Sequence, residues 1–512
     1  MNTPVLAAVV GAGAEQAIAI VCAVLAAGAL VAPQPRLRAV AMALALIATP
    51  TLLALHRWDT SSFSVVRNHP AVAAAAAVVG LVSLAGLAWL IRRRPQLFAL
   101  LAVAALPFRV PVTLSGTTYN LLIPLYAVIA AGALAWIVVL LRGRVQGPAA
   151  AVRGLPGAVR WLLAASIVLY AVQALYSTRF NIALGQVIFF YVPFALLLAL
   201  IAELRWDARL MRLCLLALVS IAGVLALVGF VELATRHLLL NSNLKAANVF
   251  GSSFRVNSLF YDPNVYGRFL ALVATLLVAA MLWTRSRREV LVATGALVVI
   301  WLALLSSLSQ SSFVALLAGL LALAALRFSL RIVGLVAGVA VVLGAVFLLA
   351  FGDVVHVNLN RAQALATASS GRSSLIQGGA DLFAQRPLGG WGSGSFAAEF
   401  RRREQSRVED PAAVSPEDRA VAASHTIPIT VASEQGAPGL ALYLGLLVAA
   451  RLLLVRGARR SPARAGLAAA FAALIVHTLL YADFLSDPST WALLGVAAAL
   501  AAAPPADPAP AR

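Results

Sequence analysis

Charged residues are scarce in this chain of 512 residues, and acidic residues are the scarcer of the two kinds. Only 11% of the residues are charged, with 19 acidic side chains against 39 basic ones, while 62% are apolar. A typical soluble domain is about 25% charged and about 45–50% apolar. The composition therefore excludes a soluble, disordered or fibrous protein, because this much apolar surface needs a bilayer to cover it.

Lysine and cysteine are nearly absent. Lys245 is the only lysine, so the formal net charge of +20 comes almost entirely from arginine. Most of the arginines lie in short links between apolar runs, which indicates membrane topology and lipid headgroups rather than nucleic acid as a partner. Cys22 and Cys214 are the only cysteines, and both lie within apolar runs. A disulfide framework, an iron–sulfur site and a cysteine-based zinc site are excluded.

Long apolar runs make up most of the chain. Because about 20 apolar residues cross a bilayer as an α-helix, each run predicts one transmembrane span. The fifteen predicted spans are 5–31, 38–56, 71–91, 95–110, 120–141, 158–176, 183–203, 209–233, 264–284, 289–307, 311–326, 331–351, 436–455, 464–482 and 488–503. We therefore expect an all-α, polytopic membrane protein with about 12–15 transmembrane helices and a large external loop that contains short helices.

Arginine-rich and arginine-poor links alternate along the chain, which predicts the orientation. Arginine-rich links stay in the cytoplasm, so the N-terminus is expected outside and the C-terminus inside. Two external links are long, and loops of more than about 15 residues are usually functional or disordered. The expected organisation is extra transmembrane helices over 1–94, a membrane core over 95–351 with the external segment 234–263, a large external loop over 352–435, C-terminal helices over 436–503 and a disordered tail over 504–512.

The first candidate site lies in residues 251–270. Asp262-Pro263-Asn264 predicts a turn and the N-cap of the helix that follows. Arg255 lies seven residues before Asp262, and Arg268 lies one turn into the helix. An arginine in a span either faces protein or a watery cavity, or extends to the lipid headgroups, and both alternatives stay open for Arg268. Guanidinium groups suit phosphate, so this segment is a candidate anion site at the outer membrane boundary.

The large loop contains a second candidate anion site. Ser370 or Ser373 is expected to cap a short helix that ends near Ala384, which would place Arg372 at an N-terminus, where free N–H groups favour anions. The glycine-rich stretch 389–394 has no preceding strand and no following helix with Lys-Ser/Thr, so it is expected to be a tight turn. Nucleotide binding is not supported.

His425 is the candidate for proton transfer. Among the six histidines, it alone lies in a long external loop beside a helix start and a turn signal. Glu434 follows nine residues later, would face away from His425 on a helix, and is expected to be structural or an arginine partner. His477 lies in a span and is expected to be a hydrogen-bonded core residue.

The external links contain no Asp-x-Asp and no His/carboxylate cluster, so we expect no dedicated divalent-metal site.

Over about residues 95–500, these segments together resemble the O-antigen ligase and polymerase superfamily of bacterial envelope enzymes. Counted from the run 95–110, twelve spans remain with both ends cytoplasmic, which is the layout that the family implies. The chain departs from the family at Gln310, where the family often has the arginine of Ser-Arg-Gly. The signatures are Arg255 followed by residues 261–267, Gly371-Arg372 followed by residues 381–392, and Ser424-His425 followed by residues 434–440.

The resemblance implies a metal-independent, inverting membrane glycosyltransferase without a cofactor, in the bacterial inner membrane and active on its periplasmic face. The implied donor is a glycan on a polyprenyl diphosphate such as undecaprenyl diphosphate, and the acceptor is a sugar hydroxyl on lipid A-core or on another lipid-linked repeat. His425 would take the acceptor proton. Arg255 and Arg372 would hold the diphosphate. The possible supporting residues are Arg268, Asp262, Asn264 and Glu434.

Two alternatives to the ligase stay open. A polymerase of the same superfamily would use a second lipid-linked glycan as its acceptor. A transporter or flippase for lipid-linked glycans would show charges at mid-membrane and inverted repeats. The charges gather in one external loop, which favours an enzyme.

Overall fold

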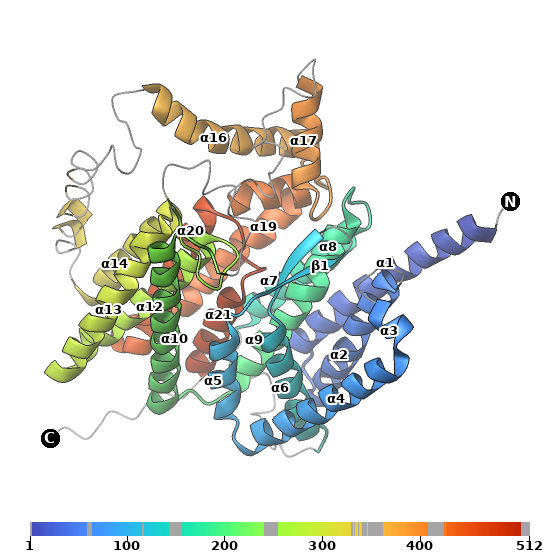
Figure 1. Ribbon diagram of the computed structural model, residues 1–512, viewed down its shortest axis with the longest axis horizontal. Helices are drawn as coiled ribbons and strands as arrows, with labels where there is room; N and C mark the ends of the chain where they lie inside the picture. The colour runs from blue at the N-terminus through green and yellow to red at the C-terminus, as the bar shows by residue number, and fades with distance from the viewer. Residues whose placement is uncertain are drawn as a thin grey trace.

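The computed structural model describes residues 3–58, 64–114, 117–142, 156–239, 254–328, 362–407 and 426–502, together with Ser424 and scattered positions between 331 and 346. These residues form a helical bundle with one small β-hairpin (Figure 1). Predicted span 331–351 is described only at those scattered positions, and the tail 504–512 lies outside the described residues.

Helices make up most of the described part of the chain. In chain order they are α1 (Thr3–Val31), α2 (Pro35–Arg57), α3 (Ser64–Asn68), α4 (Pro70–Arg93), α5 (Gln96–Ala105), α6 (Ile123–Leu141), α7 (Gly157–Ala174), α8 (Phe180–Gln186), α9 (Val192–Glu203), α10 (Ala208–Thr235), α12 (Pro263–Trp283), α13 (Arg287–Ser307), α14 (Gln310–Arg327), α16 (Ala362–Gln385), α17 (Phe396–Arg407), α19 (Ile427–Val455), α20 (Pro462–Leu480) and α21 (Pro488–Ala502). A π-helical turn, η3 (Val187–Tyr191), joins α8 to α9, and a 3₁₀ turn, η6 (Ala458–Arg460), precedes α20.

Within the described ranges, twelve helical segments are long and apolar enough to cross a membrane. The apolar helices α5 and α21 are shorter, with 10 and 15 residues. The expectation of an all-α, polytopic membrane protein with about 12–15 transmembrane helices is confirmed. Predicted span 311–326, although short, is the helix α14 of 18 residues.

Predicted span 95–110 is too long, and span 120–141 begins too early. The helix α5 ends at Ala105, and the chain continues as an antiparallel hairpin of β1 (Val110–Leu114) and β2 (Thr117–Leu121) before α6 begins. Pro107 and Pro111 cannot continue a helix, because proline lacks the N–H that a helix needs. The Val and Thr residues between and after them favour extended backbone. Local residue type therefore overrides the apolar pattern here.

The last predicted loop residues are helical. The helix α19 begins at Ile427, so residues 427–435 of the predicted loop 352–435 belong to the same helix as predicted span 436–455. Gly436 interrupts this helix with φ 66° and ψ −164°, and the helix kinks there. The boundary expected at residue 436 is thus a kink inside α19.

The large-loop helices lie over one end of the bundle. Figure 1 shows α16 and α17 at the top of the view, above α19, and both helices contact α19. They share a small core formed by Leu375, Leu382, Phe396 and Phe400. Below them, α12 packs against α13, α14 and α20 and is one of the most buried spans. The candidate functional site lies where the N-terminal end of α12 meets α14 and α20.

Candidate functional site

Asp262 is the N-cap residue of α12, as predicted. Its backbone is extended, and its Oδ1 accepts a hydrogen bond of 2.6 Å from the Asn264 N–H. Pro263 occupies the first turn, where its missing N–H costs nothing. The N-cap expectation is confirmed, and the cap fixes the position of Asn264 in the first turn of α12.

Arg255 and Asn264 lie together. Arg255 Nη2 donates to Asn264 Oδ1 at 3.2 Å, and Arg255 Nε donates to the Ser307 carbonyl oxygen at 3.2 Å. Ser309, the N-cap residue of α14, donates its hydroxyl to the same Asn264 oxygen at 2.9 Å. The half-buried Arg255 guanidinium therefore lies where the N-termini of α12 and α14 meet. Helix N-termini carry partial positive charge, which adds to the guanidinium charge.

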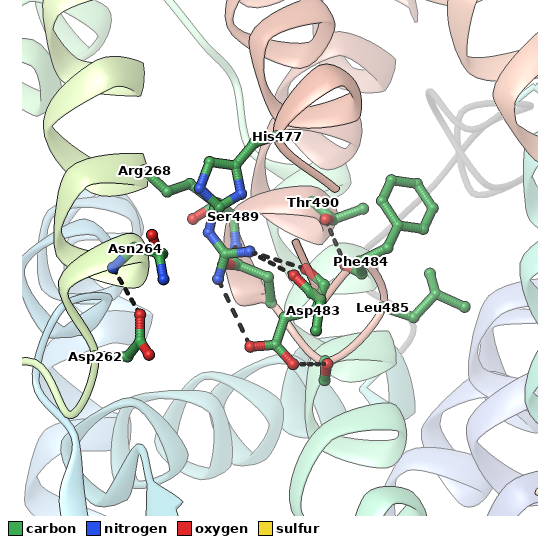
Figure 2. Close-up of polar contacts among 12 residues, drawn as sticks. Asp262, Asn264, Arg268, His477, Asp483, Phe484, Leu485, Ser489 and Thr490 are labelled. Atoms are coloured by element: carbon green, nitrogen blue, oxygen red, sulfur yellow. Dashed lines mark hydrogen bonds and ion pairs between the residues drawn. The ribbon is translucent and has the colours of Figure 1, made fainter. Parts of the chain in front are cut away.

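Arg268 faces protein. Its side chain is 2% exposed, and its Nη2 lies 2.5 Å from Asp487 Oδ2. Nη1 donates to the carbonyl oxygens of Ala482 and Asp483 at 3.2 and 3.1 Å, and Figure 2 shows the guanidinium directed at this turn with His477 beside it. Of the two alternatives, contact with protein is the one found. Support of the anion site by Arg268 stays a prediction.

Tyr261 connects this turn to the segment before α12. Its hydroxyl donates to Asp483 Oδ2 at 3.0 Å. Burial, and then the nearby Asp483 carboxylate, raise the pKa of Tyr261 well above its ordinary value, so the hydroxyl stays a donor at neutral pH. The Arg109 guanidinium lies over the Tyr261 ring, with Cζ 5.5 Å from the ring centroid.

A buried polar network continues from Asn264 into the bundle. His477 is fully buried, and its Nε2 lies 3.2 Å from Ser311 Oγ. Ser311 Oγ in turn lies 3.2 Å from Ser309 Oγ. The expectation of a hydrogen-bonded core histidine is confirmed. The sequence analysis did not select Ser309 and Ser311, although a serine cluster between two apolar runs is a signal for a buried polar contact. It selected Gln310 instead, and the Gln310 side chain is exposed.

Glu434 on α19 is hydrogen-bonded to the glycine-rich turn 389–394 of the large loop and to the residues just after it. Its carboxylate accepts hydrogen bonds from the backbone N–H groups of Gly394 at 2.8 Å and Phe396 at 3.0 Å. Of the two expected roles, the structural one is found. Two backbone donors satisfy a carboxylate that burial would otherwise penalise.

The turn itself packs closely on the kink of α19. Gly390, Gly392 and Gly394 have positive φ, as expected for a tight turn. The Gly392 N–H donates to the Glu434 carbonyl oxygen at 2.9 Å. A Cβ at Gly390 would overlap that same carbonyl, and a Cβ at Gly436 would overlap the backbone of Pro387 and Leu388, just before the turn. Only glycine allows this approach, which holds the loop against the bundle.

The predicted cap near Arg372 is wrong. Helix α16 begins at Ala362, so neither Ser370 nor Ser373 starts it, and Arg372 lies within the helix rather than at its N-terminus. The helix-terminus argument for anion binding does not hold there. The side chain of Arg372 and the whole of His425 lie outside the described residues, so their distances from Arg255 are not defined. The neighbours of His425 are placed, with Thr426 as the N-cap residue of α19.

The carboxylates and the imidazole at this site each contact a different protein group. Across the described part of the chain, no group of three His, Cys, Asp or Glu side chains is arranged to hold a metal ion. Asp262, Asp483 and Asp487 are engaged by a backbone N–H, by Tyr261 and by Arg268 respectively. The site therefore offers cationic and neutral donors rather than a set of metal ligands.

Comparison with known families identifies one domain. Residues 295–444 match the family model described as O-antigen ligase. The matched region runs from α13 into α19 and includes Ser307, Ser309, Arg372 and His425, whereas Arg255 precedes it. No match to a curated protein is found. The family match confirms the resemblance to the O-antigen ligase superfamily and supports an O-antigen ligase or polymerase type of function in a multi-pass membrane protein.

Proposed function

We propose that the protein is an O-antigen ligase-like glycosyltransferase. It transfers a glycan from an undecaprenyl diphosphate, or another polyprenyl diphosphate, to a sugar hydroxyl such as one on lipid A-core. The observation that carries this proposal is the position of Arg255, which precedes the O-antigen ligase domain in sequence but is held against it by the Ser307 carbonyl. An arginine fixed in this way beside two helix N-termini is suited to an anionic leaving group.

The reaction is a substitution at the anomeric carbon. The acceptor oxygen forms a bond to that carbon from the face opposite the diphosphate, the bond from carbon to the diphosphate oxygen breaks, and the configuration inverts. The diphosphate leaves with the bonding electron pair, and arginine charge stabilises it as its negative charge grows. The acceptor proton passes to neutral His425, acting as general base.

Five further candidate residues have a defined part in the proposal. Arg255 and Arg372 hold the diphosphate, so no metal or other cofactor is needed for that step. Asp262 positions Asn264, which in turn fixes Arg255 through the contacts already described. Glu434 acts at a distance, by holding the loop turn against α19.

The proposed location follows from the arginine distribution. Arginine-rich links tend to remain in the cytoplasm. This tendency supports the proposal that the large loop and the segment before α12 face the periplasmic side of a bacterial inner membrane. The polyprenyl tail would remain in the bilayer while its diphosphate reaches the site at the membrane boundary. Membrane lipids are the other expected partners, and nucleic acid is not one.

The test is reconstitution of the full chain in liposomes with an undecaprenyl diphosphate-linked glycan. One sample receives lipid A-core as acceptor and another receives only a second portion of donor, each with and without EDTA. The proposal expects glycan on lipid A-core at an EDTA-independent rate. Elongation of the carrier-linked glycan instead identifies a polymerase, and glycan movement across the bilayer without a new bond identifies a transporter. Loss of transfer on EDTA addition contradicts the metal-independent reaction.

A further inference from the structure

Two serines at the start of α14 connect His477 on α20 to the Asn264 side chain on α12. His477 Nε2 lies 3.2 Å from Ser311 Oγ, and Ser311 Oγ lies 3.2 Å from Ser309 Oγ. Ser309 Oγ lies 2.9 Å from Asn264 Oδ1, the same oxygen that Arg255 Nη2 contacts at 3.2 Å. The histidine and both serines are buried. A continuous line of hydrogen bonds therefore joins α20 to the Arg255 guanidinium.

The arginine end determines the direction in which these hydrogen bonds run. A guanidinium only donates, so the Asn264 atom that faces Arg255 is the amide oxygen, which only accepts. Ser309 must therefore donate its single hydroxyl proton to that oxygen. The Ser309 oxygen can then only accept from its two other neighbours, Ser311 at 3.2 Å and Ser312 at 2.7 Å.

The same reasoning assigns the proton of His477. Ser311 gives its one hydroxyl proton to Ser309, so its oxygen accepts from the ring, and Nε2 of His477 carries the hydrogen. The other ring nitrogen, Nδ1, is buried and has no hydrogen-bond partner among the described residues. A neutral ring leaves an acceptor there, whereas an imidazolium would leave a charged N–H without an acceptor, which is more costly. The Arg268 guanidinium beside the ring (Figure 2) would also repel a second cation.

We propose that His477 is a positioning residue for Arg255, and that it acts by holding the Asn264 amide with its oxygen toward the guanidinium. This inference rests on the proposed function, in which Arg255 holds the diphosphate. A serine hydroxyl can rotate, so without the histidine N–H the hydroxyls of Ser311 and Ser309 are free to reverse. A reversed Ser309 would accept from an Asn264 amide turned by half a rotation, and that amide would present its NH₂ group to Arg255.

The first experiment measures binding of glycan-free undecaprenyl diphosphate to the full chain in nanodiscs. His477→Leu removes the N–H but keeps apolar bulk, so the dissociation constant should rise about two- to tenfold, which corresponds to one hydrogen bond. His477→Gln keeps an N–H at a similar distance along the side chain and should restore the affinity. Thr478→Val is the matched control, because Thr478 is buried on the same helix and donates its hydroxyl to the Ile475 carbonyl oxygen of that helix. The control should leave the affinity unchanged.

The second experiment tests whether His477 acts through Arg255. Residues of one hydrogen-bond network give non-additive effects, whereas the effects of independent substitutions add. In a protein that already carries Arg255→Ala, His477→Leu should therefore cause no further loss of affinity. Ser311→Ala interrupts the line between the two residues and should raise the dissociation constant as much as His477→Leu does. If His477→Leu does not fold, Ser311→Ala takes its place in both experiments.

The outcomes separate this inference from the proposed function. If Arg255→Ala weakens binding but His477→Leu and Ser311→Ala do not, the inference is wrong and the proposed function stands. The inference is also wrong if His477→Leu costs the same affinity with and without Arg255, if His477→Gln binds as weakly as His477→Leu, or if Thr478→Val weakens binding equally. If the unaltered protein does not bind undecaprenyl diphosphate, or if Arg255→Ala binds it equally well, the diphosphate role of Arg255 is wrong and the inference falls with it.

Discussion

Arg268 on α12 and Asp487 in the link before α21 form a buried ion pair, with 2.5 Å between Nη2 and Oδ2 and with side chains that are 2% and 5% exposed. The same guanidinium donates to two carbonyl oxygens of the turn after α20. Burying two charges is costly unless each is paired and hydrogen-bonded, and both conditions hold here. The pair therefore fixes α12 to the α20–α21 link directly beside the Asp262–Asn264 segment.

Removing one partner of this pair should destabilise the protein strongly. Arg268→Ala is expected to lower the free energy of unfolding by about 3–5 kcal/mol, because it leaves Asp487 buried without a counter-charge. The double variant Arg268→Met with Asp487→Leu should recover most of that loss. Denaturant unfolding in detergent micelles measures both variants. A single variant as stable as the unaltered protein, or a double variant no better than the single one, contradicts the expected cost of the unpaired charge.

Two adjacent glycines offer a matched test of the loop attachment. Gly390 has a φ of 66°, and its added Cβ would overlap the Glu434 backbone, whereas a Cβ at Gly389 would meet only Tyr176 Oη at 3.9 Å. Gly390→Ala should therefore lower stability by more than the roughly 1–2 kcal/mol of left-handed backbone strain alone. Gly389→Ala should change stability little. Thermal unfolding and limited proteolysis of the 352–435 loop are the measurements, and equal effects of the two substitutions would show that the turn is not packed as described.

Local signals in the sequence were sufficient for the Asp262 cap and for the turn at 389–394. A proline after an aspartate restricts the backbone to a helix start, and glycines repeated at short spacing allow the positive φ angles of a tight turn. The structure has both features as expected. The start of α16 was missed because two serines were interpreted as caps. The alanine- and leucine-rich residues 362–366 before them are strong helix formers, and the helix extends through them.

Long-range pairing could not be predicted from the sequence. Arg268 and Asp487 lie on segments far apart in the chain, so the sequence left open whether Arg268 faces protein or headgroups. The buried polar network from Asn264 to His477 could not be predicted for the same reason. It joins three helices, α12, α14 and α20, whose packing the hydrophobic pattern does not specify. Apolar runs determine that helices cross the membrane, but not which of their polar residues meet.

Arg255 is expected to affect donor binding directly. Arg255→Ala should raise the dissociation constant for undecaprenyl diphosphate about tenfold or more, because a charge-assisted contact to the diphosphate is lost. Asn264→Ala should have a smaller effect, since it removes one of the hydrogen bonds that hold the guanidinium. Binding to the full chain in nanodiscs is the measurement.

The matched control for this prediction is Arg236→Ala. Arg236 is an exposed arginine at the end of α10, and its Cζ lies 5.7 Å from the Phe254 ring centroid. Its removal changes net charge by the same amount and should leave donor affinity unchanged. Equal affinities of the Arg255 and Arg236 variants would remove Arg255 from the diphosphate site.

His425 is expected to affect turnover without affecting donor binding. His425→Ala removes the proposed general base, so kcat should fall by about 10²- to 10⁴-fold. The donor is held by arginines, so the dissociation constant for undecaprenyl diphosphate should stay the same. His237→Ala, at an exposed histidine after α10, is the control and should retain full activity. Turnover in the His425 variant close to that of the unaltered protein would assign proton removal to another group, and a parallel loss of donor affinity would indicate that the substitution disturbs the site as a whole.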